Sequence, residues 1–240
     1  MKSILIDMGN TFCKVALSEK REISVVHRFK RDELLNGIIG ILPDDLPSHF
    51  EKCVISSVSG GYDEIEEYFE QKGVKVIALS SKIPLPIKID YSTPETLGAD
   101  RIAAAIGAHS LFPGEECIVF DLGSAITIDF VESDGTFKGG NISPGMAMRF
   151  KAMHQFTNKL PLVSPTEVKQ LNGQSTLEAI NNGVVLGIVF EIERYIERFP
   201  SRKIIFTGGD SIFFAKILKS TIFAVCNLVL IGLSNIGSDE

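Results

Sequence analysis

The chain carries the same short pattern twice, once in each half of its length. Residues 4–17 read ILIDMGNTFCKVAL and residues 118–131 read IVFDLGSAITIDFV, so each segment passes from an apolar stretch through Asp-x-Gly to a second apolar stretch. The two aspartates, Asp7 and Asp121, are separated by nearly half of the 240 residues. This repetition predicts two similarly built halves that face each other across a cleft. A carboxylate at a strand end, followed by a glycine turn, suits a site for phosphates and a metal ion.

Composition limits the classes of protein to which the chain can belong. A hydrophobic content of 45% in 240 residues is enough for one large domain or two small ones with well-packed cores. The formal net charge of −6 and the pI near 5.4 argue against nucleic acid as the main partner, because phosphate binding calls for a basic surface. We therefore expect a globular protein that binds no nucleic acid.

The sequence also gives an expectation for the cellular compartment. The N-terminus lacks the apolar core of a signal peptide, and the longest apolar run, 184–190, is about a third of the roughly 20 residues that cross a membrane. The cysteines are scattered without a CxxC pair or metal-ligand spacing, which favours reduced, mostly buried thiols. We expect a soluble cytoplasmic protein without a membrane partner. The cysteines are Cys13, Cys53, Cys117 and Cys226.

Hydrophobic periodicity and turn residues predict alternating strands and helices. The first half is expected to form strands at 3–8, 13–18, 22–29, 53–58 and 74–79, and helices at 31–42 and 62–71. A proline-rich loop at 82–94 leads to a helix at 98–111. The second half is expected to form strands at 116–121, 125–132, 137–140 and 203–206, helices at 146–157, 176–199 and 211–219, and a final strand and helix within 223–236. This order predicts an α/β fold with mixed sheets flanked by helices.

The segment from Asp7 to Lys14 is the first candidate for binding chemistry. Gly9 lets the backbone approach a ligand closely, and the N–H groups of the tight turn that follows can converge on phosphate oxygens. Asp7 at the strand end can hold Mg²⁺ through water, because Mg²⁺ prefers a few carboxylates together with phosphates. Lys14 could reach a phosphate. An ordinary hairpin with polar turn formers is the alternative, and recurrence of the motif at 121–124 argues against it.

The tetrapeptide Gly98-Ala-Asp-Arg101 stands at the start of the expected helix 98–111. An aspartate in a first helical turn, such as Asp100, is commonly a capping or dipole residue. The functional alternative is a general base beside a cation. Asp100 would accept the proton of a substrate hydroxyl, and Arg101 would hold a substrate anion in a bidentate fork. Such a pair suits a small hydroxy acid as substrate.

Two glycine-rich segments and the histidines give weaker signals. The segment 139–145 (GGNISPG) joins a strand to a helix and is either a connector required for steric reasons or a mobile loop that closes on nucleotide. The segment 207–210 (TGGD) follows a strand and opens a helix, where a glycine pair allows close approach to a ligand. The histidines show no metal-ligand spacing and are interpreted as structural or surface residues. They are His27, His49, His109 and His154.

Taken together and in order, these segments resemble one family. The segments are Asp7-Met-Gly-Asn-Thr, Gly98-Ala-Asp-Arg, Asp121-Leu-Gly-Ser-Ala, residues 139–145, Leu160-Pro-Leu and Thr207-Gly-Gly-Asp. They resemble the type III pantothenate kinases, which belong to the acetate and sugar kinase, Hsc70 and actin superfamily, over essentially the whole chain. The resemblance implies an actin-like ATPase fold with a central cleft between two ribonuclease-H-like halves, residues 1–97 and residues 98–240, the latter including the crossing helix.

The same resemblance implies an activity, cofactors and residue roles. The ATP γ-phosphoryl group would pass to the hydroxyl of pantothenate and give 4'-phosphopantothenate, the first step of coenzyme A biosynthesis. Asp100 would be the proton acceptor, Asp121 would bind a monovalent cation, K⁺ or NH₄⁺, and Ser124, where the family usually has threonine, would contact ATP. The phosphate-binding segment would comprise Asp7, Met8, Gly9, Asn10, Thr11, Phe12, Cys13 and Lys14. Pantothenate would contact Tyr91, Gly98, Ala99, Asp100, Arg101 and Thr176. A divalent cation such as Mg²⁺ would accompany ATP, and a homodimer would help to enclose pantothenate.

Two other functions remain open at this point. A nucleotide-binding regulatory protein of the same fold, such as an accessory factor for transcription, is disfavoured by Asp100 and Arg101, because a pure binding module needs no proton acceptor. A phosphohydrolase of the same superfamily, such as an exopolyphosphatase, would release phosphate from nucleotide without pantothenate. Measuring ADP formation with and without pantothenate would separate these functions.

Overall fold

The computed structural model describes residues 2–237, and their contacts divide the chain into two compact units. The first unit comprises Met1–Glu115, Asp129–Gly139 and Asn227–Glu240, and the second comprises Glu116–Ile128 and Gly140–Cys226. Both units combine strands and helices, which confirms the predicted α/β class. These units are made of non-contiguous segments, so they do not test the predicted division into ribonuclease-H-like halves at residues 1–97 and 98–240, which stays a prediction.

The first unit is built on a mixed sheet with the strand order β3-β2-β1-β5-β6, and β4 also pairs with β2. β1 and β2 form the predicted antiparallel hairpin, with Met8 opposite Cys13, while β5 and β6 continue the sheet in parallel. The strands are β1 (Lys2–Met8), β2 (Cys13–Glu19), β3 (Glu22–Ile23), β4 (His27–Phe29), β5 (Lys52–Ser57) and β6 (Lys75–Ala78). The hairpin turn therefore lies beside the end of β5.

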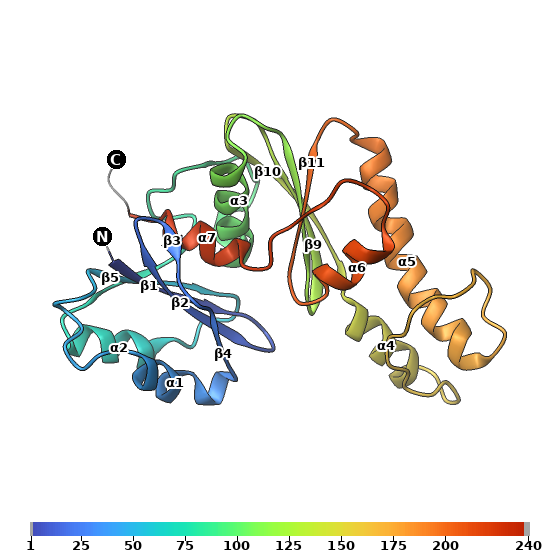
Figure 1. Ribbon diagram of the computed structural model, residues 1–240, viewed down its shortest axis with the longest axis horizontal. Helices are drawn as coiled ribbons and strands as arrows, with labels where there is room; N and C mark the ends of the chain where they lie inside the picture. Colours follow the sequence, from blue (N-terminus) through green and yellow to red (C-terminus); the bar gives the residue numbers. More distant parts are fainter. Residues whose placement is uncertain (1, 238–240) are drawn as a thin grey trace. The chain divides into compact units, whose positions relative to one another are not determined.

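Helices cover both faces of this first sheet (Figure 1). On one face, α1 (Leu34–Ile41), preceded by the 3₁₀ helix η1 (Arg31–Glu33), and α2 (Asp63–Gln71) pack against a buried apolar cluster. Alternate strand residues such as Ile4, Ile6 and Ile55 belong to that cluster, because successive side chains of a strand point to opposite faces. The other face of β1 and β5 contacts α3 (Ala99–Leu111) and α7 (Leu228–Ser234).

Glycines allow α3 and α7 to cross at unusually short range. A Cβ atom on Gly107 of α3 would lie 2.5 Å from the carbonyl oxygen of Leu228, and one on Gly232 of α7 would lie 1.8 Å from that of Ala103. Neither position accepts a side chain unless the helices move apart. The C-terminal helix thus packs directly against the helix that begins with the predicted substrate motif.

The second sheet has the strand order β12-β11-β8-β9-β10-β7. Its strands are β7 (Lys88–Ile89), β8 (Cys117–Leu122), β9 (Ala125–Val131), β10 (Thr136–Pro144), β11 (Lys203–Thr207) and β12 (Phe223–Ala224). β11 runs parallel to β8, with Thr207 opposite Asp121. The second predicted Asp-x-Gly motif therefore lies at the end of a strand, next to the strand that leads into the segment 207–210.

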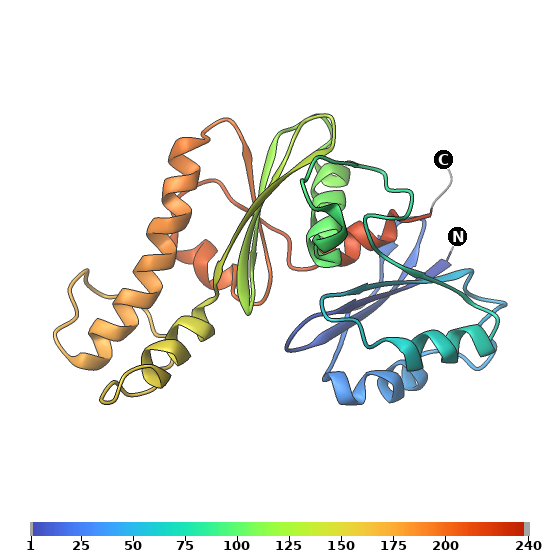
Figure 2. The ribbon, with the colours of Figure 1, turned by 180° about the vertical axis from the view of Figure 1, so that it is seen from behind.

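The helices of the second unit are α4 (Met146–Gln155), α5 (Thr176–Arg198) and α6 (Ser211–Ile217). α4 and α5 lie side by side (Figure 2) and are joined by an ion pair of 2.5 Å between Arg149 and Glu191. The ring of Phe120 packs edge-on against the rings of Phe206, at 5.4 Å between centroids, and Tyr195, at 5.9 Å. These aromatic contacts join β8, β11 and α5 in one core.

Three predictions of secondary structure were wrong in detail. The expected strand 22–29 is divided into β3 and β4, because the Ser24 hydroxyl accepts a hydrogen bond of 2.9 Å from the Leu17 N–H in place of a backbone carbonyl. The expected loop 82–94 contains the edge strand β7 and leads into the 3₁₀ helix η2 (Pro94–Thr96). Residues 139–144, interpreted as a connector or a mobile loop, continue the strand β10.

Two predictions about burial and membranes can be compared with the structure. All four cysteines are thiols, and three of them, Cys13, Cys53 and Cys117, are buried, as expected. Within residues 2–237, no helix combines the length and the apolar composition needed to cross a bilayer.

Candidate functional site

The first predicted motif forms the end of β1, the hairpin turn and the start of β2. Asn10, Thr11 and Phe12 are exposed at the turn, whereas Met8 and Cys13 point into the core. A Cβ atom on Gly9 would lie 3.1 Å from the Phe12 carbonyl oxygen, so a side chain there would require a small shift of the tight turn. Residues 10–12 of this turn are therefore accessible from solvent.

Asp7 and Asp100 are brought close together in the first unit. Burial raises the pKa of Asp7 from 3.8 to about 6, against the lowering effect of Lys14, and the negative charge of Asp100 raises it further. Lys14 lies opposite Asp7 in the antiparallel pair of β1 and β2. Asp7, Asp100 and Lys14 of the predicted site thus influence one another electrostatically.

Asp100 occupies the first turn of α3, where Gly98 is the N-cap residue. Its Oδ1 accepts a hydrogen bond of 2.9 Å from the Arg101 backbone N–H, and a Cβ atom on residue 98 would lie 2.5 Å from the same oxygen. Burial raises the pKa of Asp100, while the hydrogen bond from Arg101 acts in the opposite direction. The Asp100 carboxylate therefore accepts a hydrogen bond from a backbone N–H at the start of its own helix. Burial nevertheless favours its protonation, and a general base must be able to take up a proton.

The Arg101 side chain is held by a residue that the sequence analysis missed. Both Nε, at 2.9 Å, and Nη2 donate to Oδ1 of Asp129 in β9, and both residues are buried, with relative exposures of 6% for Arg101 and 0% for Asp129. Burial acts against the charged guanidinium, but the hydrogen bonds and charge of Asp129, with help from Tyr91, raise the pKa of Arg101. Two of its three nitrogens are therefore committed within the protein.

Tyr91 completes this cluster, with the guanidinium carbon of Arg101 at 5.9 Å from its ring centroid. The ring also packs edge-on against Phe137, at 6.0 Å between centroids. Gly139 has a φ of +87°, and a Cβ atom there would lie 3.1 Å from the Tyr91 ring. This first glycine of the segment 139–145 therefore serves to admit Tyr91, which is a steric role.

In the second unit, Asp121 lies beside the turn that follows β11. A Cβ atom on Gly208, whose φ is +89°, would lie 2.4 Å from the Asp121 Oδ1, so only glycine fits there. The Asp210 N–H donates a hydrogen bond of 2.9 Å to the Leu122 carbonyl oxygen, and burial raises the pKa of Asp210. The structure thus brings together the two motifs of this half, 121–124 and 207–210.

Ser124 and Thr176 complete the predicted residues of the second unit. A Cβ atom on Gly145 would lie 2.5 Å from the Ser124 carbonyl oxygen, so the last glycine of the segment 139–145 also meets a steric need. Thr176 is exposed at the first residue of α5, directly after Ser175, whose hydroxyl caps that helix by accepting from the Glu178 N–H. Thr176 is therefore accessible to a small molecule.

The carboxyl groups of Asp7, Asp100 and Asp121 are the candidate metal ligands among the predicted site residues. Within residues 2–237, no group of three or more His, Cys, Asp or Glu side chains could hold a metal ion. Mg²⁺ commonly uses one or two carboxylates together with substrate phosphates, and Asp7 and Asp100 are ligands of that type. Asp121, with neighbouring backbone carbonyl oxygens, likewise offers the oxygen donors that suit K⁺. The residues fit both ions in chemical type.

The histidines lie outside this constellation of residues. His154 Nδ1 is 2.8 Å from the Leu160 carbonyl oxygen, and His27 stacks on Phe29 at 6.4 Å between ring centroids. A Cβ atom on Gly135 would lie 2.8 Å from Nε2 of His109. A hydrogen-bond contact for His154 and packing for His27 and His109 agree with their interpretation as structural or surface residues, although the buried Nδ1 of His109 has no hydrogen-bond partner among residues 2–237.

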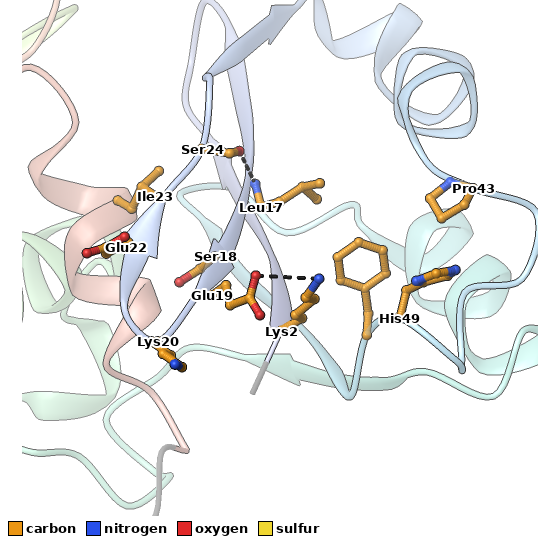
Figure 3. A pocket seen from close by; sticks show the side chains of 11 residues that line it. Lys2, Leu17, Ser18, Glu19, Lys20, Glu22, Ile23, Ser24, Pro43 and His49 are labelled. Carbon is orange, nitrogen blue, oxygen red and sulfur yellow. Dashed lines mark hydrogen bonds and ion pairs between the residues drawn. The ribbon is translucent and has the colours of Figure 1, made fainter.

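A separate pocket of about 690 Å³ lies near the end of β1 and β2 that is remote from their hairpin turn (Figure 3). Its lining includes Lys2 and Glu19, which form an ion pair of 3.4 Å, together with Lys20 and His49. None of the predicted site residues lines it. The pocket is therefore distinct from the residues singled out by the sequence motifs.

Comparisons with known proteins identify the family. The family model for type III pantothenate kinase matches residues 3–198. A type III pantothenate kinase from Porphyromonas gingivalis is 37% identical over 243 residues, covering 98% of this chain and 97% of that protein. One from Phocaeicola vulgatus is 40% identical over 238 residues, with coverages of 98% and 97%.

Solved structures show the same fold at lower sequence identity. A conserved Campylobacter jejuni protein, described as a candidate Baf family transcriptional activator, has a TM-score of 0.65 at 24% identity, with 97% of this chain and 96% of that chain covered. A ROK family glucokinase from Streptomyces griseus has a TM-score of 0.51 at 13% identity, with coverages of 98% and 99%. These likenesses confirm the predicted actin-like kinase fold. From the family model and the near-complete match to its relatives, the chain belongs to the type III pantothenate kinase family.

Proposed function

We propose that this protein transfers the γ-phosphoryl group of ATP to the hydroxyl of pantothenate and so catalyses the first step of coenzyme A biosynthesis. The observation that carries the proposal is similarity of 37% identity to a type III pantothenate kinase over 98% of the chain. The presence of every predicted motif in the expected order supports it. We also propose that the reaction takes place in the cytoplasm, where ATP is available to a soluble enzyme.

Asp100 is proposed as the proton acceptor for the pantothenate hydroxyl. Its raised pKa supports this role, because a base works best when its pKa approaches the working pH. Tyr91, Gly98, Ala99, Arg101 and Thr176 are proposed to contact pantothenate. Since Asp129 holds the guanidinium of Arg101 in place, Arg101 would meet the substrate in a fixed orientation rather than as a mobile cation.

The residues from Asp7 to Lys14, together with Ser124, are proposed to bind ATP. The tight turn at Gly9 supports this, because backbone N–H groups of such turns surround phosphate oxygens. Asp7 is proposed to hold Mg²⁺ through water, and Asp121 to bind K⁺ or NH₄⁺. These ions would neutralise phosphate charge, so the role of the protein is mainly to position the reacting groups.

A homodimer is proposed as the working form of the enzyme. Several large apolar side chains of the second unit are exposed on β10, α4, the segment 156–175 and α5, and an interface would remove them from water. They include Ile142, Met148, Phe156, Leu171, Leu177 and Phe190. Sedimentation of the protein at micromolar concentration tests this point, because a monomer at all concentrations would contradict it.

One coupled assay of ADP formation tests the proposed activity. It compares reactions with and without pantothenate, and with K⁺ replaced by Na⁺. We expect ADP formation to depend on pantothenate and to fall in Na⁺. ADP formation that is independent of pantothenate would instead favour a phosphohydrolase, and nucleotide binding without turnover would favour a regulatory protein.

A further inference from the structure

Ser56 in β5 is a fully buried residue whose hydroxyl has no hydrogen-bond partner among residues 2–237. Its relative exposure is 0%. A buried hydroxyl without a partner destabilises a protein by about 1–3 kcal/mol compared with an apolar group of similar size. The residue two positions earlier on the same face of the strand is Val54, so apolar side chains are compatible with this surface. Core packing alone therefore does not explain a serine at this position.

The register of the first sheet places Ser56 next to Asp7. The two residues are direct partners in the parallel pair of β1 and β5, and neighbouring strands lie about 4.8 Å apart. Ile6 and Ile55, the residues that precede them, both point into the core cluster beneath α1 and α2. Asp7 and Ser56 therefore share the opposite face, which contacts α3 and α7.

The second acid of the site lies on α3, the helix that packs against this face of the sheet. Asp100 lies in the first turn of α3, and its charge reaches Asp7, on which it acts unfavourably. Lys14 is the cation that the antiparallel pairing sets opposite Asp7. A hydroxyl on the neighbouring strand supplies a dipole that can orient toward a carboxylate without adding a further charge.

We propose that Ser56 is a positioning residue for Asp7, whose carboxylate accepts a hydrogen bond from the Ser56 hydroxyl when ATP and its cation occupy the phosphate-binding turn. The inference rests on the proposed assignment of Asp7 to the ATP site. Rotation about the side-chain bonds of both residues is sufficient to form this contact, since their Cα atoms are paired across adjacent strands. The hydroxyl is then unsatisfied in the free protein and used in the complex.

The test is Ser56→Ala, read out by thermal unfolding and by the affinity for Mg-ATP measured without pantothenate. We expect the variant to be at least as stable as the wild type, because the unsatisfied hydroxyl is removed. We expect its affinity for Mg-ATP to fall about tenfold or more, since a hydrogen bond to a charged group is lost. Ser56→Cys, which has a somewhat larger side chain and keeps a weaker donor, should lose less affinity.

Ser3→Ala is the matched control. Ser3 is also a buried serine on the same face of the same sheet, but it is paired with Lys52, about 13 Å along the strand from Asp7. The affinity of the Ser3→Ala variant for Mg-ATP should equal that of the wild type. An affinity of Ser56→Ala within about twofold of the wild type overturns the proposal, and so does a clear loss of thermal stability. Because ATP binding is measured directly, a wild type that binds ATP but ignores pantothenate would refute the proposed activity and leave this test intact.

Discussion

Replacing Asp7 with asparagine should stabilise the ligand-free protein at neutral pH. Asp7→Asn keeps the size of the side chain and removes its ionisation. Burial, together with the charge of Asp100, holds the pKa of Asp7 at about 6 rather than 3.8, a value that already includes the favourable effect of Lys14. One pKa unit corresponds to about 1.36 kcal/mol, so ionised Asp7 lowers the free energy of unfolding by up to about 3 kcal/mol.

The sign of this effect fixes its pH dependence. Below about pH 3.8 Asp7 is protonated in both the folded and the unfolded chain, and its ionisation affects stability little. As the pH rises from 3.8 to about 6, the unfolded chain ionises first, so the folded state of the wild type loses stability relative to the variant. About one pH unit above this pKa and beyond, the difference should stay constant.

Urea unfolding at several pH values between 4 and 8, with EDTA and without nucleotide, measures this difference. We expect the free energy of unfolding of Asp7→Asn to exceed that of the wild type by an amount that grows from pH 4 to pH 7. Asp134→Asn is the control, since Asp134 is exposed and hydrogen bonds with Thr136 lower its pKa, so this variant should gain nothing at neutral pH. A difference for Asp7→Asn that is independent of pH would refute the reasoning.

Three further variants test other parts of the site. Asp100→Asn should lower turnover by about 10²–10⁴-fold while nucleotide binding stays largely intact, and near-normal turnover in the ADP assay would remove Asp100 from its role. Asp129→Asn leaves the Arg101 guanidinium buried without its counter-charge and should destabilise the protein by about 3–5 kcal/mol in urea unfolding, whereas wild-type stability would show that the pair contributes little. Gly232→Ala should cost about 1–3 kcal/mol and reduce turnover as well, because its methyl group would overlap the Ala103 carbonyl oxygen, whereas Gly183→Ala, with no atom within 4 Å of the added carbon, should be tolerated.

The elements that could be predicted from the sequence are those determined by local pattern. The hairpin of β1 and β2 follows from two apolar stretches on either side of a Gly-Asn turn, and the long helix α5 follows from its helical periodicity. The short strand β7 could not be predicted in this way. Its two residues, Lys88 and Ile89, are strand because they pair with Thr136 and Phe137, which lie far along the chain.

The residues of the candidate site likewise fall into those that the sequence displays and those that only the structure reveals. Asp7, Asp100 and Asp121 stand in motifs that the sequence displays, whereas Asp129 lies inside the apolar strand β9 and is recognised only through its contact with Arg101. A signal for Asp129 was nevertheless present, because a charged residue within an apolar strand requires a buried partner. For Ser56 the sequence offers no comparable signal, since the lack of a hydrogen-bond partner for its hydroxyl is a property of the fold.

The position of the proposed base is set by residues outside the motif that contains it. Asp100 is followed by Arg101, whose guanidinium is fixed on Asp129 in β9, so the first turn of α3 is tied to the sheet. Two turns further along, Gly107 fits closely against α7, and α7 is in turn held at its end by a hydrogen bond of 2.5 Å from buried Lys52 to the Ile236 carbonyl oxygen. A side chain at either glycine of the crossing would displace α3 as a rigid body and carry Asp100 with it. Substitutions at the crossing of α3 and α7, such as Gly232→Ala, should therefore change turnover through the geometry of the proposed base.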